Sequence, residues 1–165
     1  MTALFDLAFA LASYDPLTST AVVDIVASAE SSQRIVSADI GFRWDEREMT
    51  LISFTDERTT IPFLLVGIPQ MPWDFYGLNE ADPPADGNGW VMWLSPLNGI
   101  PVIEEKAIVG SLVFTVHAEK TTLSFIDRVR VDYPFRTVVY GTDTPGLDIT
   151  GELSSLVIRR DRDAR

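Results

Sequence analysis

Apolar and polar residues alternate with a period of two along most of this chain. The segment Val36–Trp44 gathers its apolar residues on one face, and the same alternation recurs at 5–11, 110–116 and 121–125. Because successive side chains of a strand point to opposite sides, this pattern predicts strands with one buried face. The run at 22–26 is more continuously apolar, which predicts a strand that is covered on both sides.

Turn-forming residues separate these apolar runs, for example Asp15-Pro16 and Thr144-Pro145-Gly146. No helical periodicity lasts beyond about two turns, and Ala27–Arg34 is expected to be a loop. Two further strands are expected at Arg136–Tyr140 and Ser155–Arg159. We therefore predict an all-β fold, a single β-sandwich of eight to ten antiparallel strands with jelly-roll or immunoglobulin-like topology.

The middle of the chain interrupts this pattern. Residues 61–103 hold seven of the ten prolines and three of the four tryptophans, which predicts a long irregular excursion between strands. Loops of that length in a compact domain usually have a function or cover an edge. Residues 159–165 form a charged tail. Since no linker or repeat divides the chain, residues 1–165 are expected to form one domain.

The charge of the chain narrows its possible partners. The net charge is −11 over 165 residues, which disfavours nucleic acid and acidic membranes and favours another protein. Without cysteines, neither disulfides nor thiolate zinc sites can form. The start Met1–Ser13 contains no Lys or Arg, so no export signal is recognised. The expected location is the cytoplasm or a virion, or outside the cell if the start is incomplete.

Five aromatic residues lie in or beside the irregular excursion, where strand alternation does not require them: Trp73, Phe75, Tyr76, Trp90 and Trp93. Tryptophan and tyrosine are enriched at contact hot spots, because each buries a large area at a small entropic cost. These residues are therefore candidates for partner binding. The alternative is a lid that covers an open end of the sandwich.

A cation loop is a second candidate site. Asp82, Asp86 and Asn88 lie in the run DPPADGNG, and calcium favours several oxygen ligands on a turn that contains glycine. The EF-hand spacing is absent, and Asp-Gly and Asn-Gly also form turns without a metal. We expect no cofactor, with calcium as the alternative to be tested.

Catalytic chemistry has weaker candidates. His117 is the only histidine and is expected to be a solvent-facing strand residue. Asp45, Glu46 and Glu48 cluster in a predicted turn, and Glu104 and Glu105 would point to opposite faces of a strand. Glycoside hydrolysis needs two carboxylates that converge in a cleft, so we expect these groups to be solvated.

Several segments, in this order, resemble the cohesin-like domains. Ala21–Ala27 is AVVDIVA, Ala38–Met49 is ADIGFRWDEREM with Glu46 where the family usually has proline, and Ala107–Val116 is AIVGSLVFTV. Thr121–Ile126 would be the hairpin partner of the last of these, and Gly151–Ile158 the closing strand. The resemblance implies a jelly-roll sandwich, related to carbohydrate-binding modules, that binds proteins such as dockerins.

Three functions follow as hypotheses. The first is a non-catalytic, cohesin-like protein-binding module that acts in assembly or scaffolding. The second is a virion structural protein, a capsid decoration or tail subunit that docks on a symmetric lattice. The third is a glycoside hydrolase that depends on carboxylates. Capture of a separate module would favour the first, and copurification with a particle the second.

Overall fold

The structure is a computed structural model that describes residues 5–29, 33–60, 64–68, 86–94, 100–102, 106–127, 137–141 and 147–160. In these ranges the chain forms strands and no helix. It therefore contains no described helix that is long and apolar enough to cross a membrane. The strands are β1 (Phe5–Asp15), β2 (Thr20–Ala29), β3 (Gln33–Asp45), β4 (Met49–Thr55), β5 (Leu64–Ile68), β6 (Asp86–Leu94), β7 (Ile100–Val102), β8 (Ala107–Val116), β9 (Lys120–Phe125), β10 (Val138–Gly141), β11 (Thr150–Ser154) and β12 (Leu156–Arg159).

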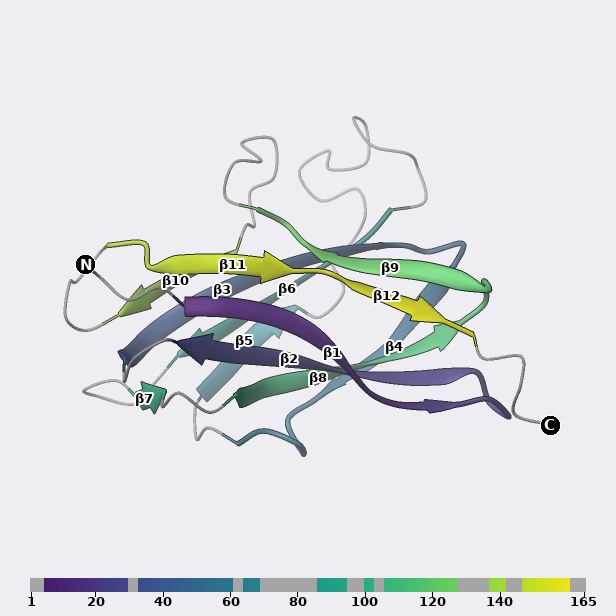
Figure 1. The fold of residues 1–165 in the computed structure, drawn as a ribbon, viewed down its shortest axis with the longest axis horizontal. Coiled ribbons are helices and arrows are strands. Elements are labelled where there is room, and N and C mark those ends of the chain that lie inside the picture. Colours follow the sequence, from purple (N-terminus) through teal and green to yellow (C-terminus); the bar gives the residue numbers. More distant parts are fainter. Residues whose placement is uncertain are drawn as a thin grey trace.

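The strands form two sheets of a β-sandwich, as the sequence predicts (Figure 1). The smaller sheet has the order β11-β1-β2-β8-β4, and the larger has the order β12-β9-β3-β6-β5. The short strands β7 and β10 also pair with β3. One pair departs from the antiparallel expectation, because β1 and β11 run parallel.

The expected hairpin between Ala107–Val116 and Thr121–Ile126 is wrong. β8 pairs with β2 and β4 in the smaller sheet, whereas β9 pairs with β3 and β12 in the larger one. The chain therefore crosses between the layers after Val116. Alternation gives each segment a buried face, but it does not say which neighbour the segment hydrogen-bonds.

Two segments expected to be irregular contain strands. Within Ala27–Arg34, β2 continues to Ala29 and β3 begins at Gln33. Within 61–103 lie β5, β6 and β7. Prolines and glycines concealed the β-pattern of this region, since both residue types usually mark turns. In the expected tail, Arg159 ends β12, and the Arg160 amide donates to the Glu119 carbonyl at 2.9 Å; residues 161–165 lie outside the described residues.

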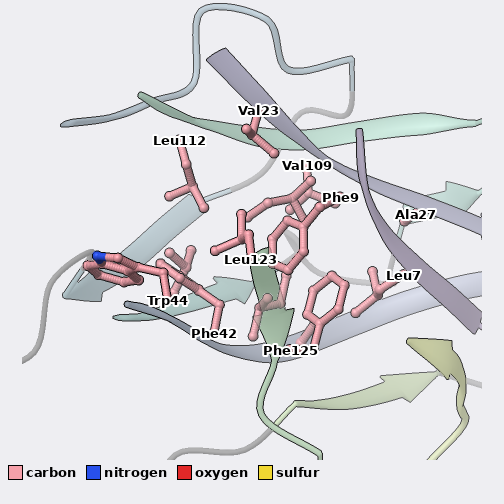
Figure 2. Close-up of a cluster of buried hydrophobic side chains, with 14 of the residues drawn as sticks. Leu7, Phe9, Val23, Ala27, Phe42, Trp44, Val109, Leu112, Leu123 and Phe125 are labelled. Atoms are coloured by element: carbon pink, nitrogen blue, oxygen red, sulfur yellow. The ribbon is translucent and has the colours of Figure 1, made fainter. Parts of the chain in front are cut away.

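The hydrophobic core lies between the two sheets and takes side chains from both. The seven residues expected there are all buried in one cluster: Phe42, Trp44, Leu112, Phe114, Val116, Leu123 and Phe125. The Phe9 ring stacks on Phe125, with their centroids 3.9 Å apart (Figure 2). Trp44 meets Phe114 edge to face at 5.5 Å, so aromatic contacts join the layers.

Leu11 and Val36 were expected on buried faces, and both are exposed. Leu11 borders a register shift between β1 and β2, and the alternating burial of β1 extends only as far as Phe9. Leu11 therefore lies beyond the covered part of the strand.

Candidate partner-binding surface

The outer face of the larger sheet presents polar residues on β3 and β9. Along β3, Ala38, Ile40, Phe42 and Trp44 are buried in the core, which leaves Ser37, Asp39, Arg43 and Asp45 on the opposite face. Thr122 of β9 is exposed on this outer face, beside Val157 of β12. In this part of the sheet the outer surface is thus polar, with charges of both signs.

The backbone register extends this face across β6 and β5. Trp90 pairs with Gly41, and Met92 pairs with Asp39. In the next strand, Ile68 is opposite Trp90 and Val66 is opposite Met92. The register thus sets apolar residue types of β6 and β5 in line with Gly41 and Asp39 of β3.

The candidate aromatic residues have different places in the fold. Trp90 and Trp93 belong to β6, a regular strand, and not to an irregular loop. Trp93 pairs with the buried Ala38, in the register of the inward face, whereas Trp90 pairs with Gly41. The two residues therefore occupy different register positions along β3. Trp73, Phe75 and Tyr76 lie outside the described residues.

The expected cation loop is partly strand. Asp86 and Asn88 lie in β6, where they pair with Asp45 and Arg43, while Asp82 lies outside the described residues. Gly87 is buried against the core, and a Cβ at this position would overlap the Trp44 indole ring. The glycine thus makes room for Trp44. Within the described ranges, no three His, Cys, Asp or Glu residues gather as a metal site would require.

The carboxylate cluster between β3 and β4 forms a turn, as expected. Asp45 accepts hydrogen bonds from Arg47, with Nε–Oδ1 at 3.0 Å and Nη2–Oδ2 at 2.7 Å. It also accepts one from the Arg47 amide at 2.8 Å. These bonds hold the pKa of Asp45 below its ordinary value, although partial burial raises it. A general acid needs a raised pKa, so Asp45 does not fit that role. Glu104 and Glu105 lie outside the described residues.

His117 is exposed, as expected, and follows directly after β8. Its Nε2 lies 2.8 Å from Thr50 Oγ1, and its amide donates to the Glu48 carbonyl at 2.7 Å. These contacts tie the end of β8 to the start of β4.

An ion pair that was not predicted lies on the outer face of the smaller sheet, between the buried Asp24 and the half-exposed Arg58. Asp24 accepts hydrogen bonds from Arg58 Nε at 2.9 Å, Arg58 Nη2 at 3.0 Å and Ser111 Oγ at 2.6 Å. Burial raises the pKa of Asp24, but these bonds and the Arg58 charge outweigh it, so the pKa lies below its ordinary value. A single charged residue inside the apolar run AVVDIVA was the available signal.

No protein-family model matches this chain, and no curated protein matches it. Solved cohesin structures do match along nearly the whole length. The sixth cohesin of Acetivibrio cellulolyticus scaffoldin B is 16% identical with a TM-score of 0.58, over 92% of this chain and 96% of that one.

Two other cohesins give similar values. The seventh ScaB type I cohesin from Pseudobacteroides cellulosolvens is 11% identical with a TM-score of 0.60, over 98% of this chain and 96% of that one. A non-cellulosomal cohesin from the archaeon Archaeoglobus fulgidus is 12% identical with a TM-score of 0.57, over 96% and 91%. The chain therefore folds as a cohesin-like β-sandwich domain.

Proposed function

We propose that this protein is a non-catalytic module that binds another protein through the outer face of its larger sheet and the adjoining excursion. The observation that carries the proposal is the cohesin-like fold along nearly the whole chain. One of the similar structures, the Acetivibrio cellulolyticus cohesin, was solved in complex with the Cel5 dockerin. A partner for this chain would be a separate protein module of comparable role.

Two features of the larger sheet support this choice of surface. Its register sets Trp90 and Met92 of β6 opposite Gly41 and Asp39 of β3, and aromatic residues and methionine are enriched at protein interfaces. Within the excursion, residues 69–85, which include Trp73 and Tyr76, connect β5 to β6 of this sheet. Its prolines restrict the free chain, which reduces the entropy lost on binding.

The experiment is to recover the partner from the native source on the immobilised protein, purify it, and titrate it against variants. Trp73→Ala and Tyr76→Ala should each weaken binding by about 2 kcal/mol or more while leaving most of the stability intact. Leu17→Ala is the matched control, because Leu17 is 94% exposed at the tip of the β1–β2 hairpin. It should change neither affinity nor melting.

Two other results would change the proposed binding surface or the proposed function. If the alanine variants lose stability while their folded fraction keeps full affinity, the excursion is a lid and not a contact surface. Recovery of the protein only in particle fractions would favour the virion structural protein instead.

A further inference from the structure

Strand β4 lies at one edge of the smaller sheet, and no described strand pairs with its outer side. Among the described strands, β4 hydrogen-bonds with β8 alone. In an antiparallel pair, alternate residues turn their N–H and C=O groups away from the neighbouring strand. The outer side of β4 therefore offers backbone donors and acceptors that a further strand could use.

The sequence of β4 does not protect this edge with charge or proline. Its residues are MTLISFT, whereas natural edge strands are commonly blunted by lysine or proline. The one irregularity of this edge is a register shift between Leu51 and Ser53, which leaves Ile52 as an extra residue. Such a bulge interrupts an edge locally, but the residue that it presents is apolar and 59% exposed. By contrast, the other edge strand of this sheet carries Glu152, and β12 ends at Arg159.

The two ends of β4 are acidic. Glu48 precedes the strand, and the exposed Asp56 and Glu57 follow it. The arginines beside them are engaged with other carboxylates, Arg47 with Asp45 at 2.7 Å and Arg58 with Asp24 at 2.9 Å. An incoming strand would therefore meet an apolar, hydrogen-bonding centre with negative charge at each end.

We propose that β4 is a strand-addition site for an extended segment of another protein, with alternating apolar residues and a lysine or arginine at each end. Main-chain hydrogen bonds would supply affinity, and the flanking charges would supply specificity. A second copy of this chain fits less well. Antiparallel pairing centred on Ile52 would set Glu48 of each copy against Asp56 of the other, and facing like charges destabilise. This site lies on the smaller sheet, so it is independent of the surface proposed above.

The test uses a synthetic peptide as long as β4, of alternating valine and threonine with a pair of lysines at each end. Binding should slow amide hydrogen exchange in β4 and leave β12 unchanged. Ile52→Lys, which adds a charge to the edge, should weaken binding by about tenfold or more. Val157→Lys is the matched control, since Val157 is a similarly exposed strand residue of the larger sheet, at 46%. It should change the affinity by less than about twofold.

Two further peptides and one further variant sharpen the result. A peptide with glutamates in place of lysines, or with a central proline, should not bind. Glu57→Lys should weaken binding of the lysine peptide without touching the edge itself. Melting curves establish that each variant is folded. Equal binding of all three peptides, unchanged β4 exchange, or failure of the lysine peptide to bind would overturn the proposal. So would a dimer of the wild-type protein that Ile52→Lys dissociates, because it would assign the edge to a second copy.

Discussion

At the scale of single residues, the structural role of a residue such as glycine depends on the side chains packed against it. The run Asp-Gly-Asn-Gly at 86–89 has the composition of a turn, yet it forms the start of β6. Gly87 is required because the Trp44 indole occupies the space that a side chain would take. The same contact explains why glycine occurs in a central strand, where it otherwise weakens packing.

The aromatic core predicts a large penalty for Phe114→Ala. Phe114 is fully buried and meets Trp44 edge to face, so its removal should lower the free energy of unfolding by about 3–5 kcal/mol. Urea unfolding measures this loss. Thr122→Ala, on an exposed position of β9, should change stability by less than about 0.5 kcal/mol. A loss below about 1 kcal/mol for Phe114→Ala would contradict its place in the core.

At the scale of elements, the Asp24–Arg58 pair fixes the segment that follows β4. Arg58 crosses to β2, and the Thr60 amide and hydroxyl bond with the Ile108 carbonyl and amide at 3.1 Å and 2.9 Å. Residues 59–60 thereby continue the pairing along β8 beyond the end of β4. The side chain of Asp24 is only 7% exposed, so its charge depends on these partners.

Because of the Asp24–Arg58 pair, we expect the stability difference between the wild type and Asp24→Asn to depend on pH. The folded pKa of Asp24 lies below its ordinary value of 3.8, so its contribution is present above that value and is lost as the pH falls through the folded pKa. At neutral pH, Asp24→Asn should cost about 1–3 kcal/mol. Urea unfolding from neutral to strongly acidic pH should show the gap to wild type shrinking. A gap that stays constant would show that the carboxylate charge contributes nothing.

At the scale of the whole molecule, the connections between layers define the fold. The chain passes from one sheet to the other after β2, β3, β4, β7, β8, β10 and β11. The parallel pair of β1 and β11 brings the first and the penultimate strands together. Because these contacts join distant parts of the sequence, a core substitution in one sheet also affects the packing of the other sheet through the shared core.

Global melting tests the remaining metal hypothesis. A ligand that binds only the native state raises the melting temperature. Our expectation is that a calcium chelator leaves the melting curve unchanged, because Asp86 and Asn88 belong to a regular strand and not to a flexible turn of the kind that calcium sites use. A downward shift that added calcium reverses would establish a calcium site and overturn this prediction.

The sequence by itself determined the local features. Period-two alternation placed Phe42, Phe114 and Phe125 in the core, because any two-layer arrangement must bury the apolar side of each strand. The carboxylate cluster Asp45, Glu46 and Glu48 indicated the turn between β3 and β4, and alternation indicated the exposure of His117. The sequence showed the candidate aromatic site only as a local enrichment in aromatic residues. The strand register then gave Trp90 and Trp93 different partners on β3, Gly41 and Ala38.

Only the tertiary structure decided which strands pair and which distant groups meet. The wrong hairpin between β8 and β9 arose because alternation is equally satisfied within one sheet or across two. Arg58 lies 34 residues from Asp24, and no local pattern links them. Strand pairing and ion pairing depend on contacts between segments that are far apart in the chain, and those contacts exist only once the sandwich has closed.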